Sequence, residues 1–176
     1  MDLGTIDRIT ADAVGEPGSR TFYLQARNGE DVVTLTVEKE QVRLLAASVL
    51  DLLASIGLET GTGPEEDAML LEEPFEPAWR AGRLSIGYEQ DTDLFLLEVE
   101  EFQPEREELE EDDPRLLLQD DPEELRLRAT REQMFALSRH ASVVIDRGRP
   151  TCQFCGNPLD PEGHACPAMN GHSKRT

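Results

Sequence analysis

The stretch "TLTVEKEQVRLLAASVLDLL" (residues 34–53) changes its hydrophobic period partway along. Leu35 and Val37 alternate with polar residues, as in a half-buried strand. From Val42 onward, apolar residues recur at intervals of three and four, which places them on one stripe of a helix. The stretch therefore predicts a short strand that leads directly into an amphipathic helix.

The same combination returns 92 residues later in "RLRATREQMFALSRHASVVI" (residues 126–145), and the two stretches align without a gap. The Glu-Gln pair at 40–41 matches the pair at 132–133, and Thr130 precedes Gln133 at the spacing of a capping box. Apolar positions also match: Val42 with Met134, Leu45 with Leu137, Val49 with Ala141, and Leu53 with Ile145. We interpret the match as an internal duplication; the alternative is chance similarity between two amphipathic helices.

Each predicted helix follows three predicted strands. The expected strands are 6–14, 20–27 and 32–37 in the first half, and 83–90, 93–102 and 125–129 in the second. The Asn-Gly pair at 28–29 is a strong hairpin signal. We therefore expect an α+β fold, in which duplicated β-β-β-α units form a mostly antiparallel six-stranded sheet with two helices on one face, followed by a C-terminal zinc-knuckle tail.

The expected organisation is a duplicated body at residues 1–149 and a zinc-binding tail at 150–176. The subdivisions of the body are the halves 5–57 and 78–148, with acidic loops at 58–77 and 103–124. Loops of this length and composition favour disorder.

The chain carries a net charge of −20, most of it in two stretches. Residues 100–124 hold 13 acidic residues and two arginines, and residues 59–76 hold seven acidic residues and no basic one. A run of this kind is usually a solvated loop and sometimes a docking surface for a basic protein. The charge argues against nonspecific binding to nucleic acid or anionic lipid, because phosphate neutralisation needs clustered cations.

The sequence also predicts no membrane segment. Its most apolar stretch, residues 44–54, is 11 residues long and contains Ser48 and Asp51, so it is too short and too polar to span a bilayer. The N-terminus lacks the basic region and apolar stretch of a secretory signal. We therefore expect a cytoplasmic protein.

All three cysteines lie within residues 152–166, a pattern typical of metal binding and not of a disulfide framework. Cys152 and Cys155 form a C-x-x-C-G motif, which brings two thiolates to one cation. The candidate sets are Cys152, Cys155 and Cys166 with His164, or the same cysteines with His172. We prefer His164, because His172 lies near a terminus that can fray. Four protein ligands close the coordination shell, so we expect structural Zn²⁺.

The segments "DRITADAVGEPGSRTFYLQAR" (7–27) and "GRPTCQFCGNPLDPEGHACPAMNGH" (148–172) resemble a family of uncharacterised actinobacterial proteins, DUF3090. The resemblance spans nearly the whole chain, with the acidic loops as the looser part. It implies a bacterial cytoplasmic protein with a C-terminal metal motif. It supplies no reaction, substrate or catalytic residue.

The preferred functional hypothesis is a noncatalytic protein-binding, adaptor or regulatory module with a protein partner. The chain shows no evident nucleophile–base arrangement, and we expect His140 to be partly exposed on the surface of the second helix.

The alternative is an enzyme or a protein that binds an anionic metabolite or nucleotide between the two halves. Its candidate groups are Arg20, Tyr23, Arg83, Tyr88, Asp91 and Asp93. Nucleic-acid recognition through the tail would rest on four dispersed cations, which makes it a minor option: Arg147, Arg149, Lys174 and Arg175.

Overall fold

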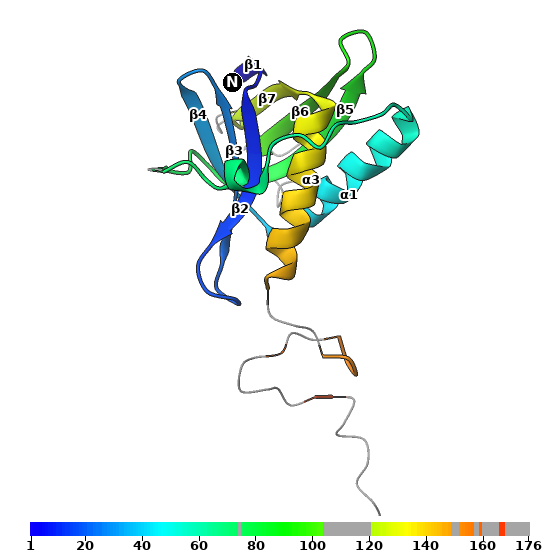
Figure 1. Cartoon of the computed structure of the whole chain (residues 1–176). Helices are drawn as coiled ribbons and strands as arrows, with labels where there is room; N and C mark the ends of the chain where they lie inside the picture. Colours follow the sequence, from blue (N-terminus) through cyan, green and yellow to red (C-terminus); the bar gives the residue numbers. More distant parts are fainter. Residues whose placement is uncertain (74, 104–120, 149–151, 157–158, 160–165, 168–176) are drawn as a thin grey trace, which may run out of the picture.

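The computed structural model describes residues 1–73, 75–103, 121–148, 152–156, 159 and 166–167 (Figure 1). The elements follow in the order β1 (Asp2–Thr5), β2 (Arg8–Val14), β3 (Thr21–Asn28), β4 (Asp31–Val37), α1 (Lys39–Ile56), η1 (Glu66–Met69), β5 (Ala81–Glu89), β6 (Leu94–Glu101), β7 (Glu124–Ala129) and α3 (Arg131–Asp146). The predicted β-β-β-α order thus occurs twice, as β2-β3-β4-α1 and as β5-β6-β7-α3. That these two halves arose by duplication stays a prediction.

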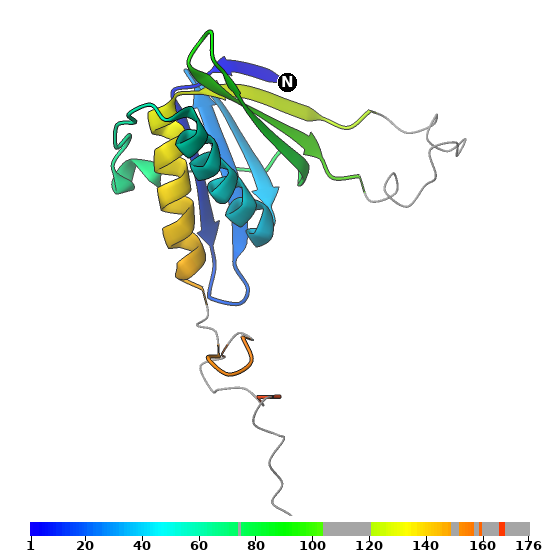
Figure 2. The same ribbon diagram turned by 90° about the vertical axis from the view of Figure 1, so that its right-hand side faces the viewer.

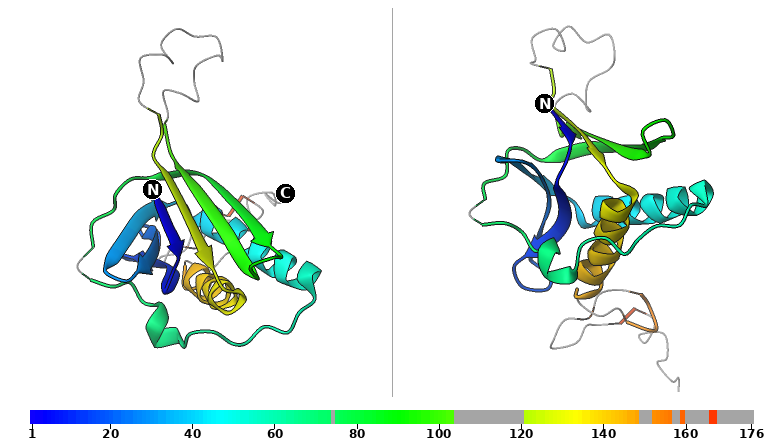
Figure 3. Two further views of the ribbon diagram at one scale, coloured as in Figure 1. Left: turned by 90° about the horizontal axis from the view of Figure 1, so that it is seen from above. Right: turned by 45° about the horizontal axis from the view of Figure 1, so that its top comes forward.

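The strands form two sheets, and the expectation of a single six-stranded sheet was wrong. Strands β2, β3 and β4 make one antiparallel sheet, and the other has the order β1-β7-β6-β5 (Figure 3). Strand β4 pairs with the residue just before β5 through a single parallel bridge, between Thr36 and Arg80. Beyond that bridge β5 pairs with β6, so the two sheets diverge.

An additional strand, β1, lies at the start of the chain. It pairs in parallel with β7, where the backbone N–H of Arg126 donates to the carbonyl oxygen of Met1 at 2.9 Å. The chain that enters β5 likewise runs parallel to β4. There the backbone N–H of Ala78 donates to the carbonyl oxygen of Thr34 at 2.8 Å. Thr34 and Arg126 are again 92 residues apart. The last strand of each half therefore binds the segment that leads into the other half.

The N-terminus of α1 is capped by Gln41. The backbone N–H of Glu38 donates to Gln41 Oε1 at 2.7 Å, as in a capping box. The amide nitrogen of the same side chain donates to the carbonyl oxygens of Ala81 and Gly82, at 3.2 and 2.6 Å. Gln41 thus caps a helix of the first half and holds the first strand of the second half.

Gln133 has the same double role at the start of α3. The N–H of Thr130 donates to Gln133 Oε1 at 2.8 Å. Gln133 Nε2 donates to the carbonyl oxygens of Ile6 and Asp7, at 3.0 and 2.9 Å, just before β2. The contacts made by Gln41 and Gln133 are therefore reciprocal.

The helices lie side by side, with α3 packed on β2 and α1 packed on β5 (Figure 2). Each helix therefore covers the first strand of the other half, whereas both were expected on one face of a single sheet. Where the helices meet, the buried Ser138 hydroxyl donates to the carbonyl oxygen of Ala46 at 2.8 Å. The apolar residues that surround this contact form one continuous core. Neither described helix is long and apolar enough to cross a membrane.

The acidic loop at 58–77 is ordered where the structure describes it, which corrects the expectation of disorder. Met69, at the end of η1, is only 1% exposed within the core. Arg8 of β2 donates to the carbonyl oxygens of Ala68, at 2.9 Å, and Leu70, and Thr10 donates to that of Met69. One apolar anchor and these backbone contacts hold the segment despite its charge. Most of the second acidic loop, 104–120, lies outside the described residues.

Replacing Gln41 or Gln133 by alanine removes both the cap and the contact between halves. We expect each variant to lower the free energy of unfolding by about 1–2 kcal/mol, measured by urea denaturation. Gln90→Ala, at an exposed turn, is the matched control and should change it by less than about 0.5 kcal/mol. Equal stability of all three variants would refute the role assigned to these glutamines.

Candidate functional site

The cysteine motif begins with a tight turn from Cys152 to Gly156. The backbone N–H of Gly156 donates to the carbonyl oxygen of Cys152 at 2.8 Å. Gly156 has a φ of +73°, a left-handed conformation that glycine adopts without steric cost. The turn thereby brings Cys152 and Cys155 together, as the C-x-x-C-G spacing predicted.

Three sulfur atoms converge at this turn. The Sγ atoms of Cys152, Cys155 and Cys166 all lie within 4.8 Å of one another. The Sγ atoms of Cys152 and Cys166 are 3.8 Å apart, and both residues are buried. A tetrahedral ion with Zn–S bonds of about 2.3 Å separates its thiolates by about 3.8 Å, whereas a disulfide needs about 2.05 Å. The three cysteines can therefore hold one metal ion.

The local backbone favours the thiolate form of Cys152. The N–H groups of Phe154 and Cys155 donate to its sulfur and lower the pKa of the Cys152 thiol. A thiolate is the form that binds a metal. Three sulfur ligands leave a tetrahedral site incomplete, and the two candidate fourth ligands, His164 and His172, lie outside the described residues. The preference for His164 stays a prediction.

His140 is fully buried, so the expectation of a partly exposed surface residue was wrong. Its Nδ1 lies 3.0 Å from Glu66 Oε1, and its Nε2 lies 3.7 Å from Asp12 Oδ2, an ion-pair distance too long for a hydrogen bond. Strand β2 and η1 cover this side of α3. The sequence carried a signal, because His140 lies three residues after Leu137 and four before Val144, on the apolar stripe.

Two residues of this cluster, His140 and Asp12, have shifted pKa values. Burial by itself lowers the pKa of His140, but the carboxylates of Asp12 and Glu66 outweigh burial and raise it. Burial acts to raise the pKa of Asp12, yet the contact with His140 and the N–H of Ala13 lower it. Arg147 also pairs with Glu66, at 3.5 Å. The cluster therefore holds η1 against α3 and β2.

The structure scatters the residues of the alternative, ligand-binding hypothesis. Tyr88 donates its hydroxyl to Asp93 at 2.6 Å, and Arg131 pairs with the same carboxylate at 2.8 Å. Asp91 is exposed in the neighbouring turn. These contacts brace the β5–β6 hairpin against the start of α3 and form no shared site with Arg20.

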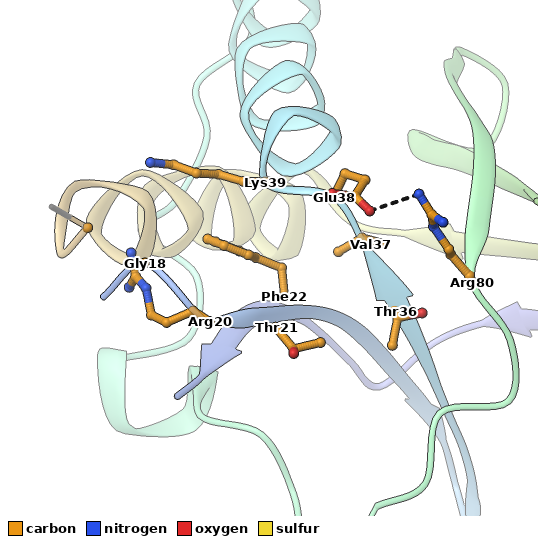
Figure 4. A pocket seen from close by; sticks show the side chains of 10 residues that line it. Gly18, Arg20, Thr21, Phe22, Thr36, Val37, Glu38, Lys39 and Arg80 are labelled. Carbon is orange, nitrogen blue, oxygen red and sulfur yellow. Dashed lines mark hydrogen bonds and ion pairs between the residues drawn. The ribbon is translucent and has the colours of Figure 1, made fainter. Parts of the chain in front are cut away.

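The remaining candidates divide in the same way. Arg83 pairs with Glu100 on the surface, and the ring of Tyr23 lies edge-on to Phe75 at 5.0 Å. Arg20 lines an open cavity of about 470 Å³, together with Lys39 and Arg80 (Figure 4). Of these three residues only Arg20 was predicted from the sequence, because Lys39 and Arg80 come near it only through tertiary packing.

The structure is that of an α+β protein in which three cysteines between residues 152 and 166 cluster closely enough to hold a metal ion. Residues 1–166 match the family described as protein of unknown function (DUF3090), and the chain belongs to this family. The resemblance to this family is thereby confirmed, and the actinobacterial origin stays a prediction. No curated protein and no solved structure matches the chain.

The cluster around His140 predicts a pH-dependent stability. Because the folded pKa of His140 is raised, its stabilising contribution is full below about pH 6.5 and disappears as the pH rises through the folded pKa. Because the folded pKa of Asp12 is lowered, its contribution is present above about pH 3.9 and disappears as the pH falls through its folded pKa. We therefore expect the free energy of unfolding to fall as the pH rises above about 6.5 and through the folded pKa of His140.

His140→Asn should remove most of this pH dependence and cost about 2–4 kcal/mol at pH 6. Glu66→Gln takes away one of the two carboxylates and should reduce the dependence without abolishing it. Urea denaturation across the pH range measures both effects. A pH profile of His140→Asn that parallels the wild type would contradict this assignment.

Proposed function

We propose that the protein is a noncatalytic protein-binding module whose C-terminal segment is folded by one structural zinc ion. The observation that carries the metal assignment is the convergence of three sulfur atoms at the spacing of a tetrahedral thiolate site. The proposed ligands are Cys152, Cys155, Cys166 and His164. His164 is preferred over His172 because it lies between Cys155 and Cys166 in the sequence, whereas His172 lies near a terminus that can fray.

A zinc ion with four protein ligands supplies folding free energy and leaves no coordination position for a reacting water. Such an ion suits this segment, which holds few apolar residues with which to build a core of its own. Three reduced cysteines also fit a reducing compartment, and we therefore propose a cytoplasmic location.

The noncatalytic part of the proposal is supported by the surroundings of His140. The imidazole of His140 is fully buried, and its two ring nitrogens face the carboxylates of Glu66 and Asp12. The proposed partner is a basic protein that contacts the acidic residues of 100–124, the most negative stretch of the chain. The same charge disfavours nucleic acid as the partner.

A second candidate function, the binding of a small anion between the two halves, is favoured by a separate observation. The cavity beside Arg20 is lined by three basic side chains in an otherwise acidic protein.

Elemental analysis of the protein purified under reducing conditions should find one zinc ion per chain. Cys155→Ser should lose it, because two sulfur ligands and one imidazole hold zinc far more weakly than four ligands do. The far-UV circular dichroism of this variant should stay close to that of the wild type, since the core of the body includes none of the cysteines.

Separate His164→Gln and His172→Gln variants identify the fourth ligand, and only the former should release zinc. A wild-type protein that holds no zinc when zinc is abundant would overturn the metal assignment.

A pull-down from the native host tests the partner. We expect the wild-type protein to retain a stoichiometric basic protein, which is then purified and titrated. Surface charge pairs contribute about 0.2–1 kcal/mol each, so replacing Glu107, Glu108, Glu110 and Glu111 by glutamine should weaken the complex about tenfold. Cys155→Ser reports whether the zinc-ordered segment takes part. Undiminished affinity in both variants would exclude these two surfaces.

A further inference from the structure

The cavity beside Arg20 has the size of a small-ligand site. Its volume is about 470 Å³, within the roughly 300–1,000 Å³ typical of such sites. The first half contributes Arg20, Phe22, Thr36 and Lys39, and the second contributes Arg80 (Figure 4). The cavity thus lies between the two halves and is open to solvent.

The charge of this cavity is opposite to that of the protein. Its lining holds three basic side chains and one carboxylate, that of Glu38, in a chain with a net charge of −20. Among the twelve arginine and lysine residues that the structure describes, nine form ion pairs with carboxylates. The other three are Arg20, Lys39 and Arg139, and the first two line this cavity. Within the described residues, Arg20 and Lys39 are therefore not neutralised by a carboxylate, whereas Arg80 is paired with Glu38.

Arg20 is held in place with donors to spare. Its Nη1 donates to the carbonyl oxygen of Val144 at 3.0 Å, and its guanidinium lies 5.4 Å from the centre of the Phe22 ring. A guanidinium carries five N–H donors in a fixed fork. Among the described residues, the contact with Val144 uses one of these donors, which leaves others for a ligand.

Lys39 approaches the same point as Arg20. A Cβ atom on Gly148 would lie 3.3 Å from Lys39 Nζ and 3.0 Å from Arg20 Nη2, so glycine leaves room for both cations at the end of α3. Two like charges this close repel each other, and an anion bound between them removes the repulsion. The N-terminus of α1, which begins at Lys39, adds positive potential to this side of the cavity.

We propose that this cavity binds the phosphate group of a small molecule, with Arg20 and Lys39 as its ligands. The Arg20 fork offers paired hydrogen bonds to phosphate oxygens, and the Lys39 ammonium supplies a point charge. The cavity is larger than an inorganic phosphate ion, and the space toward Thr36 and Arg80 accommodates the remainder of an ester. Arg80 is already paired with Glu38 at 3.0 Å and defines the far side of the cavity (Figure 4).

A purely structural role for the two cations is the competing explanation. Arg20 contacts a carbonyl oxygen of the last turn of α3, where positive charge stabilises the helix dipole. In that case the cations would stabilise the fold and the cavity would bind no phosphate. The following experiment separates the two explanations.

Isothermal titration calorimetry on the full-length, zinc-loaded protein compares inorganic phosphate, ribose 5-phosphate and ribose. We expect saturable binding of the two phosphates and none of ribose. Tighter binding of ribose 5-phosphate than of inorganic phosphate identifies an ester as the preferred source of the group, and the reverse order identifies the free ion. Lys39→Gln should weaken phosphate binding about tenfold, the loss expected for one charge-assisted hydrogen bond.

Arg43→Gln is the matched control, because it removes the same charge from the exposed surface of α1 outside the cavity lining. It should leave the affinity for phosphate unchanged. Arg20→Lys keeps the charge but loses the fork, and should weaken binding while the protein stays folded. Absence of saturable phosphate binding to the wild type, or equal weakening in Lys39→Gln and Arg43→Gln, overturns the proposal. Among the described residues, none that lines the cavity belongs to the cysteine segment, so the outcome is independent of the zinc assignment.

Discussion

The structure depends on two glutamine side chains that each satisfy groups in both halves. Gln41 and Gln133 cap their own helices and hold the strand that begins the other half. A helix N-terminus has unsatisfied backbone donors, and the start of a strand has unpaired carbonyl oxygens. One amide side chain meets both needs, because it accepts and donates at once. Neither half completes its own hydrogen bonding, so the two halves stabilise each other.

The secondary structure was predictable because it follows local patterns. The change from alternation to helical spacing after Val37 placed α1, and the matching pattern 92 residues later placed α3. The number of sheets was not predictable, because local pattern does not record which distant strands meet. The four-residue strand β1 carried too little pattern to be seen, and the composition of 58–77 concealed the single apolar anchor at Met69.

The candidate sites also differ in whether local sequence patterns predict them. The spacing of Cys152 and Cys155 predicted a turn that brings sulfur atoms together, and the structure places Cys166, also named from the sequence, in the same cluster. His140 was misjudged because an ionisable residue on an apolar stripe is buried only when distant carboxylates accompany it. The cavity depends on residues from both halves, and only one of its cations was named from the sequence. A site whose residues lie close together in the sequence can be predicted from it, whereas a site formed by residues of several distant elements cannot.

The reciprocal contacts between the two halves also raise the question of domain swapping between chains. Every contact that the first half offers to the second could equally be offered to the second half of another molecule, which is the geometry of domain swapping. The segment at 58–73, pinned by Met69 and by Arg8, keeps the two halves of one chain at the right separation to close on themselves. That segment thus acts as a tether between the end of α1 and the chain that enters β5.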